Sequence, residues 1–395
     1  MADVEGAMPL AARLSLKESL LQTPDPLILA LPKVELHLHI EGILSPALKW
    51  KFATRNNIQL RHPSTNRVFA SLSEYSDSHD PMKSHSKTSG SGDTMNNSEE
   101  TLSFFEAYYG GFEVLKTKQD YYDLGMHYFH RAAEMNVRYC ELFFDPQGHT
   151  KTGVSWEIMM GGFREAQEEA ERELNVKSSW IMCFLRDSEP EEAMAHYLAA
   201  LPYRDMIVGI GLDSYEVDRP PALFAEVFTR ARADGFRITA HCDVGSCYPL
   251  SHIQQVVSKS ELGMDRIDHG LNAAASPQMI ASIKARGGDA SAEFGLTICP
   301  WSYIRHQPCE EVFRGIRVLF DAGVRMGIGS DDPAFMEDTW ILENLLVAKK
   351  FCKFTDLEMV TLARDAVKIC WAEDGVKKGI LDEIDEVRRR FGVGG

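Results

Sequence analysis

The 395-residue sequence has few of the features that mark secreted and membrane proteins. It contains 8 cysteines and no C-x-x-C pair, which argues against a disulfide scaffold and favours reduced, buried thiols. No apolar run reaches the roughly 18 residues that a membrane-spanning helix needs. No basic stretch followed by an apolar core marks a secretory signal. We therefore expect a cytoplasmic protein, with the nucleus as the alternative location, and no membrane partner.

Positive charge is also scarce. The chain has 42 Lys and Arg against 58 Asp and Glu, a net charge of −16. Because nucleic-acid-binding surfaces are usually basic, this balance predicts no nucleic-acid partner. It leaves a small neutral substrate open, such as a nucleobase or nucleoside. The sequence indicates no particular oligomeric state.

Short β-rich runs alternate with amphipathic helical patterns along most of the chain. The first run is not followed by a G-x-G-x-x-G motif, which argues against a doubly wound dinucleotide-binding sheet. Strands alternating with helices predict an α/β protein, a closed (β/α)8 barrel with extra helices, as one domain over 1–395. The predicted strands are 33–39, 136–144, 178–185, 206–212, 236–241, 266–269, 296–299 and 325–329. Helical patterns between them include 156–174, 221–234, 277–285 and 310–322. Extra helices are expected at 10–21 and 355–391.

One segment, 71–100, has a different composition. It is rich in Ser, Asp, Asn and Gly and poor in large apolar residues. We expect a mobile, disordered insertion without a core of its own, and solvated loop histidines at His79 and His85.

The most informative motif is the pair His37 and His39 in the first predicted strand. Residues two apart in a strand point to the same side, so both imidazoles can face one point. Two ordinary core or surface histidines are the alternative. The pair gains weight from polar residues at the ends of the other predicted strands.

In a barrel of this kind the chemistry collects where the strands end. Histidines occur at two further ends, His241 and His269, and the pair Asp331–Asp332 follows the eighth strand. Other polar residues at strand ends are Asp145, Arg186, Asp213 and Ser214. Charged groups at the end of an apolar strand are costly unless they are paired or bind a metal. A helix cap or turn is the alternative for Asp331 and Asp332, which precede Pro333.

His37, His39, His241 and Asp331 form a plausible nitrogen and oxygen set for Zn²⁺, with a position left for water. His269 then has a natural place beside that water. Asp332, next to a ligand, can accept a hydrogen bond from the water or the substrate. These residues therefore predict a hydrolytic metal site at the barrel mouth.

The same residues resemble the adenosine and adenine deaminase family of metal-dependent amidohydrolases, and most closely its adenine deaminase branch. The motifs run in family order from about residue 31 to 335. They are LPKVELHLH (31–39), FFDPQGHT (143–150), MCFLRD (182–187), GIGLDS (209–214), EV (216–217), RIDHG (266–270), CP (299–300) and SDDPA (330–334). The insertion 71–100 is the main stretch without a counterpart.

The resemblance implies one divalent metal, usually zinc, attack of metal hydroxide on C6 of a 6-aminopurine, and release of ammonia. By resemblance, His37, His39, His241 and Asp331 are the metal ligands. His269 resembles the histidine that orients the hydroxide, Asp332 the aspartate that contacts the purine near N7, and Ser214 the strand-4 residue whose backbone meets the ring. Five residues at the strand ends are expected to bind the substrate: Asp332, Ser214, Asp213, Asp145 and Arg186.

One substitution departs from the family. The family's strand-5 motif is His-Ala-Gly-Glu, and its glutamate protonates the purine ring. Here the motif reads His241-Cys242-Asp243-Val244, so valine stands at the glutamate position. Loss of a positioned acid typically lowers the rate by about 10²–10⁴-fold.

Three accounts of this departure stay open. In the first, Asp243 supplies the proton and joins His269 and Asp332 as a catalytic residue. In the second, the site acts on an N6-substituted adenine or another amino-heterocycle. In the third, the chain is a metal-binding pseudoenzyme.

Overall fold

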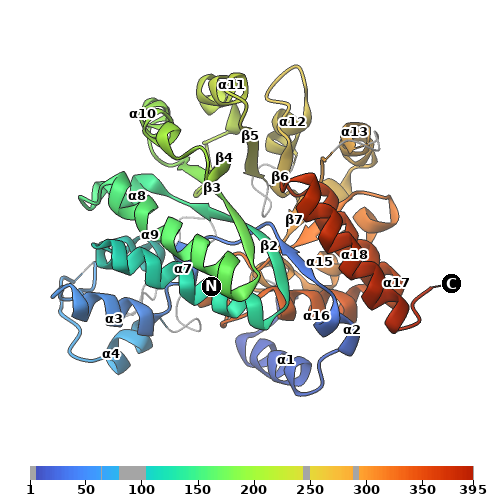
Figure 1. The fold of residues 1–395 in the computed structure, drawn as a ribbon, viewed down its shortest axis with the longest axis horizontal. Coiled ribbons are helices and arrows are strands. Elements are labelled where there is room, and N and C mark those ends of the chain that lie inside the picture. The colour runs from blue at the N-terminus through green and yellow to red at the C-terminus, as the bar shows by residue number, and fades with distance from the viewer. Residues whose placement is uncertain (1–5, 64, 80–103, 243–249, 288–292, 395) are drawn as a thin grey trace.

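A computed structural model of the chain describes residues 6–63, 65–79, 104–242, 250–287 and 293–394. Within them, a sheet of eight parallel strands runs in chain order around a barrel (Figure 1). Its strands are β1 (Lys33–Glu35), β2 (Val137–Phe144), β3 (Lys177–Leu185), β4 (Ile207–Asp213), β5 (Arg237–Cys242), β6 (Arg266–His269), β7 (Leu296–Ile298) and β8 (Met326–Ile328). The predicted (β/α)8 fold is confirmed, with each strand near its predicted place.

The first and last strands meet through residues just beyond their ends. Leu38 forms a parallel bridge with Asp331, and the amides of Ser330 and Asp331 both donate to the carbonyl of His37. This approach requires Gly329, because a Cβ there would lie 2.6 Å from that carbonyl oxygen. The first predicted strand, 33–39, is therefore shorter than expected: regular pairing ends at Glu35, and single bridges continue at Leu38 and His39.

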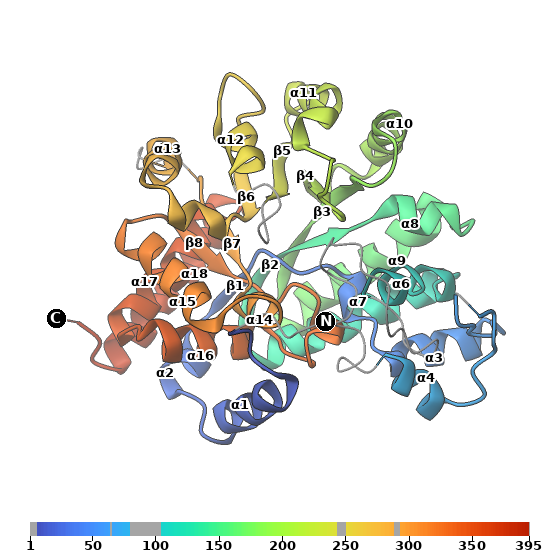
Figure 2. The same ribbon diagram turned by 180° about the vertical axis from the view of Figure 1, so that it is seen from behind.

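Helices surround the sheet in the order that the alternating sequence pattern predicts, as Figures 1 and 2 show from opposite sides. The α-helices are α1 (Leu10–Gln22), α2 (Pro26–Ala30), α3 (Pro46–Arg55), α4 (Leu72–Ser78), α6 (Phe104–Tyr109), α7 (Lys118–Glu134), α8 (Pro146–Lys151), α9 (Trp156–Glu169), α10 (Pro190–Ala200), α11 (Ala225–Ala233), α12 (Ser251–Val257), α13 (Pro277–Gly287), α14 (Pro300–Ile304), α15 (Cys309–Asp321), α16 (Ile341–Cys352), α17 (Asp356–Ile369) and α18 (Asp374–Arg390). Short 3-10 and π turns are η1 (Glu41–Ile43), η3 (Phe112–Val114), η4 (Ala170–Leu174), η5 (Leu201–Tyr203), η6 (Pro221–Phe224), η7 (Leu271–Ala275) and η8 (Pro333–Phe335).

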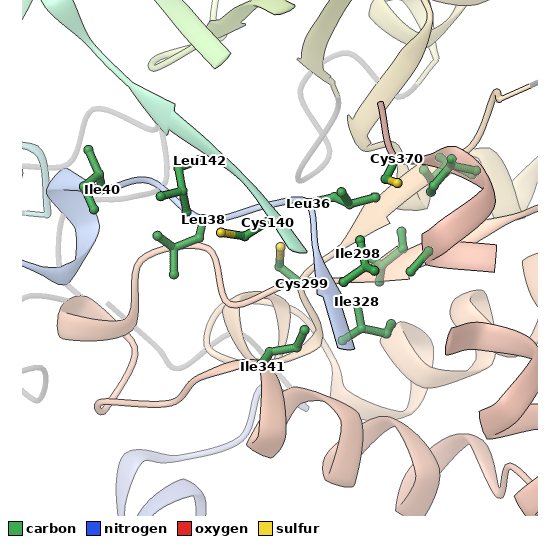
Figure 3. Close-up of a cluster of buried hydrophobic side chains, with 14 of the residues drawn as sticks. Leu36, Leu38, Ile40, Cys140, Leu142, Ile298, Cys299, Ile328, Ile341 and Cys370 are labelled. Carbon is green, nitrogen blue, oxygen red and sulfur yellow. The ribbon is translucent and has the colours of Figure 1, made fainter. Parts of the chain in front are cut away.

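The segment after β1 places apolar and polar side chains on opposite sides. Leu36, Leu38 and Ile40 are buried in the hydrophobic core, while the intervening His37 and His39 are buried polar residues. Figure 3 shows the three apolar residues among side chains of neighbouring segments, such as Leu142, Ile298 and Ile328. Because side chains of an extended chain alternate, the packing of one set aims the other set away from this core.

The prediction of a disordered insertion over 71–100 is wrong for its first residues. Its first residues form α4, where the Ser71 hydroxyl accepts a hydrogen bond from the amide of Glu74 at the helix N-terminus. Tyr75 of this helix is buried and its ring lies 5.1 Å from that of Phe69. His79, expected in a solvated loop, is half-buried and its Nδ1 lies 2.8 Å from the carbonyl of Tyr75. Residues 80–100 of the predicted insertion, with His85, lie outside the described residues.

Two further sequence expectations concern the whole chain. The described cysteines form no disulfide; six are buried and Cys309 is half-buried, in agreement with reduced thiols. No helix among the described residues combines the length and apolar character needed to cross a membrane. One domain over 1–395 stays a prediction.

Candidate active site

Three histidines converge where β1 and β5 end. The Nε2 atoms of His39 and His241 lie 3.0 Å apart, and the ring centroids of His37 and His241 are 4.7 Å apart. A nitrogen from each of the three rings lies within 4.8 Å of the other two. All three residues are buried. The structure thus brings together imidazoles that are more than 200 residues apart in the sequence.

Neighbouring groups set the tautomers of two of these rings. The Nδ1 of His241 lies 3.1 Å from the carbonyl of Leu212, which only accepts, so its Nδ1 carries the proton. The Nδ1 of His37 lies 2.7 Å from the hydroxyl of Thr297, and that hydroxyl donates to Asp268. His37 therefore donates through Nδ1. In both rings the lone pair is left on Nε2, as in metal-bound histidines whose second nitrogen is held by an acceptor.

Asp331 completes the group from the end of β8. Its Oδ1 lies 3.4 Å from Nε2 of His37 and 3.8 Å from Nε2 of His39. Burial acts to raise the pKa of Asp331, but the close contact with His37 and the neighbouring imidazoles outweigh it and hold the pKa well below its usual range. Burial lowers the pKa of His39 to about 3. The Asp331 carboxylate thus lies beside His39, whose imidazole is neutral near pH 7.

These residues fit a divalent cation. The Nε2 of His37 is buried without a hydrogen-bond partner, although such atoms are rarely left unpaired. Three imidazole nitrogens and one carboxylate oxygen are the donors that zinc takes at catalytic sites. The thiol of Cys299 belongs to an overlapping group with His37, His269 and Asp331, and burial raises its pKa well above the usual value.

His269 and Asp332 border the cluster. The ring of His269 lies 4.4 Å from that of His37, and its Nδ1 lies 2.9 Å from the hydroxyl of Tyr303. Burial lowers the pKa of His269 to about 4. The Oδ1 of Asp332 is buried and unpaired. Residue 42 is glycine because a Cβ there would lie 2.2 Å from this oxygen.

Backbone strain marks the same strand ends. Ser214 (φ 72°), His269 (φ 65°) and Asp331 (φ 66°) follow or end β4, β6 and β8 in the left-handed region. For residues other than glycine this conformation costs roughly 1–2 kcal/mol each. Such strain persists where the surrounding structure imposes it and gathers at functional sites.

A group of buried carboxylates lies beside the histidines. The Oδ2 of Asp213 is 3.4 Å from Nδ1 of His39, and ligand atoms of Asp145, Asp213 and His39 lie within 4.8 Å of one another. Tyr108 of α6 donates to Asp145 at 2.9 Å and lies 3.5 Å from an oxygen of Glu41. Burial, followed by the charge of Asp145, raises the pKa of Asp213 well above its usual value. Asp213 therefore lies behind His39, where it can orient that ring.

Two other predicted site residues have neighbours that the sequence did not indicate. The hydroxyl of Ser214 lies 2.5 Å from that of Tyr109. Arg186 is buried, and its guanidinium donates to the carbonyls of His241 and Arg219. It lies behind a histidine of the cluster. Asp243 and Val244, on which the expected proton donor depends, lie outside the described residues.

Sequence reasoning missed several residues that contact the site, among them Glu41, Tyr108, Thr297 and Tyr303. Only Glu41 had a local signal, since it continues the two-residue spacing of His37 and His39. The others come from α6, β7 and α14, and no pattern in the sequence connects them to the histidines.

Comparison with known proteins agrees with this arrangement. The adenosine deaminase family model matches residues 32–387. The chain belongs to the adenosine deaminase family. An adenine deaminase of Rhodospirillum rubrum is 37% identical over 355 residues, covering 89% of this chain and 96% of the relative. The structure of an adenine deaminase from Arthrobacter aurescens superimposes with a TM-score of 0.76 at 30% identity, covering 91% and 100%.

A second solved structure shares the fold at lower identity. It is a zinc-bound amidohydrolase from Burkholderia ambifaria, with a TM-score of 0.76 at 22% identity, covering 98% of this chain and 96% of that one. Family and fold together confirm the predicted class of enzyme: the protein is a hydrolytic deaminase that acts on a carbon–nitrogen bond.

Proposed function

We propose that this hydrolytic deaminase of an adenine-type base works through one zinc ion held by His37, His39, His241 and Asp331. The observation that carries the proposal is the 3.0 Å separation of the Nε2 atoms of His39 and His241, with the Asp331 carboxylate beside them. A hydrogen bond between these two rings accounts for their own contact but leaves the Nε2 of His37 buried and unpaired, whereas a cation among the three rings and the carboxylate gives every one of these atoms a partner.

A divalent ion bound there supplies a Lewis acid that makes water a nucleophile near neutral pH. The protein's own groups orient that ion's ligands. Thr297 and Asp268 hold His37, the carbonyl of Leu212 holds His241, and Asp213 lies at Nδ1 of His39. Such second partners fix ring orientation and raise ligand basicity.

We assign His269 and Asp332 to the water and the substrate. His269 is held at Nδ1 by Tyr303 and is neutral, so its ring can orient the attacking water without repelling a cation. The unpaired Oδ1 of Asp332 faces the polar edge of the base. Ser214 is proposed to bind the base, and Asp145 and Arg186 to shape the pocket from behind, through Tyr108 and the carbonyl of His241.

Attack of water on C6 places electrons on N1 of the purine, which must take up a proton before ammonia leaves. We propose that Asp243 supplies this proton in place of the family's glutamate, because Val244 has no proton to give. The alternative reaction is hydrolysis of an N6-substituted adenine or another amino-heterocycle. A pseudoenzyme is the third account.

An ammonia-release assay on zinc-loaded protein tests the proposal. We expect turnover of adenine, and compare adenosine, adenylate and, by amine release, N6-alkyl purines. Turnover of N6-alkyl purines alone would favour the second account. Background rates on every compound, with zinc bound, would leave the pseudoenzyme. The proposed location is the cytoplasm, or else the nucleus, and the proposed partner is a small purine-like substrate.

A further inference from the structure

Helix α1 lies before residue 32, where the family match begins, yet it carries a buried charge. Arg13 is 1% exposed. Its guanidinium donates to both carboxylate oxygens of Glu337, at 3.0 and 2.8 Å, and to the carbonyl of Met8. A two-bond arginine–carboxylate pair fixes direction as well as distance.

Glu337 lies five residues after Asp332, at the end of the segment that follows β8. It also accepts a hydrogen bond from the indole of Trp301, at 2.7 Å, and lies 3.5 Å from Arg305. Both of these residues follow β7, in or next to α14. One buried carboxylate thus joins α1 to the segments that follow the last two strands.

The backbone at this point is strained. Glu337 and Asp338 both have φ of 54°, in the left-handed region. Lys17, one helical turn after Arg13, donates to both of their carbonyls, at 2.8 and 2.6 Å. Consecutive strained residues persist only where their surroundings hold them, and here two side chains of α1 do so.

The chain before α1 fastens it to the same region. The amide of Met8 donates to the carbonyl of Ile304, and the amide of Cys309 donates to the carbonyl of Gly6. Ile304 ends α14, which also carries Tyr303, the partner of His269. The N-terminal segment and α1 therefore contact both the segment after β8, which carries Asp331, and α14 after β7, which carries Tyr303.

We propose that Arg13 and Lys17, together called the α1 clamp, are positioning residues that hold the Asp331–Asp332 segment in its metal-binding and substrate-binding place. The inference rests on the proposed function, because it takes Asp331 as a metal ligand. The clamp acts through Glu337 and the backbone after β8, and it touches neither metal nor substrate.

Zinc affinity of the full-length protein tests the clamp without relying on turnover. The variants are Arg13→Gln, Glu337→Gln and the double variant, with zinc measured by competition against a chelator. We expect Arg13→Gln to weaken zinc binding about tenfold, the lower end of what loss of an outer partner costs. The double variant should bind zinc no more weakly than Glu337→Gln alone, within about twofold, because the side chain of Arg13 reaches the segment after β8 through Glu337. In assays of adenine turnover, these variants should have a lower kcat and a higher KM for adenine than the wild type.

Arg138→Gln is the matched control. It breaks the 2.9 Å ion pair with Glu383 at the opposite end of the barrel, where β2 begins. Because this pair is partly exposed, we expect at most a small fall in melting temperature and a zinc affinity at the wild-type value. A control that loses as much zinc affinity as Arg13→Gln would overturn the clamp, because the effect would then follow general stability.

A folded Arg13→Gln protein with zinc affinity within twofold of wild type would also overturn it. If Arg13→Gln does not fold, Lys17→Met decides by the same two results, because it removes only the bonds to the carbonyls of Glu337 and Asp338 and a 3.5 Å contact with the Asp338 carboxylate. A wild-type protein that binds zinc but deaminates no purine would refute the proposed reaction and leave the zinc test of the clamp intact. A wild-type protein that holds no zinc would refute both.

Discussion

The Nδ1 of His37 lies 2.7 Å from the hydroxyl of Thr297, and both residues are buried. Because the Thr297 hydroxyl donates its hydrogen bond to Asp268, it can only accept a hydrogen bond from the Nδ1 of His37. The ring is thus held with its lone pair on Nε2, toward His241 and Asp331. This chain of hydrogen bonds connects the segment after β1 to β7 and β6 and decides which nitrogen of His37 is available to a metal.

Thr297→Val should weaken zinc binding about tenfold or more, since it removes the acceptor that sets the His37 tautomer while keeping the side-chain shape. Thr239→Val is the control. Thr239 is equally buried and donates to the other oxygen of Asp268, at 2.7 Å, without contacting His37. Titration against a zinc chelator compares the two. Equal losses of zinc affinity in the two variants would show that the hydrogen bonds to Asp268, rather than the His37 tautomer, control zinc binding.

Removal of a proposed ligand should remove the metal. Purified wild-type protein is expected to contain about one zinc ion per chain, and His37→Ala or Asp331→Ala close to none, because each substitution removes one of the proposed donors to the ion. His127→Ala, a half-buried histidine of α7, should keep the ion. Elemental analysis of the three variants gives the answer. A folded wild-type protein without any divalent metal would contradict the site.

Asp243→Asn should lower the rate of adenine deamination about 10²–10⁴-fold, the usual cost of losing a positioned acid, while the zinc content stays unchanged. Asp205→Asn, at an exposed surface ion pair with Arg164, should be neutral. Steady-state kinetics and metal analysis on the same preparations separate chemistry from binding. Full activity of Asp243→Asn would eliminate this residue as the proton donor, and Val244→Glu would then test whether the family's acid restores turnover.

The metal-free protein should lose stability as the pH falls from about 6.5 to 4. Burial lowers the pKa of His269 from 6.5 to about 4, so between these values the unfolded chain binds a proton that the folded one does not. The contribution is fully present above pH 6.5. It is lost as the pH falls toward 4, by at most about 3 kcal/mol for this residue.

Urea unfolding of metal-free wild type and His269→Gln at several pH values measures this contribution. The difference in unfolding free energy between the two should change across the pH 6.5 to 4 window in favour of the variant at low pH. Parallel curves would mean that His269 titrates normally in the folded protein.

The barrel could be predicted well from the sequence because short apolar strands alternate with amphipathic helices. Each of these patterns can be recognised within a short stretch of the chain. Strand β6 lies where 266–269 was expected. The insertion was predicted less well, because the burial of Tyr75 depends on Phe69 and Trp50, which composition does not reveal.

What the sequence by itself determined is the set of chemical groups and their place at strand ends. His37 and His39 share a spacing of two, and Asp331 follows an apolar strand, so their convergence at one end of the barrel follows from chain geometry. Only the tertiary structure decided which nitrogen each ring presents, that Asp213 and Arg186 lie behind His39 and His241, and that Arg13 reaches Glu337. These relations depend on contacts between residues far apart in the chain, and such contacts leave no periodic trace in a sequence.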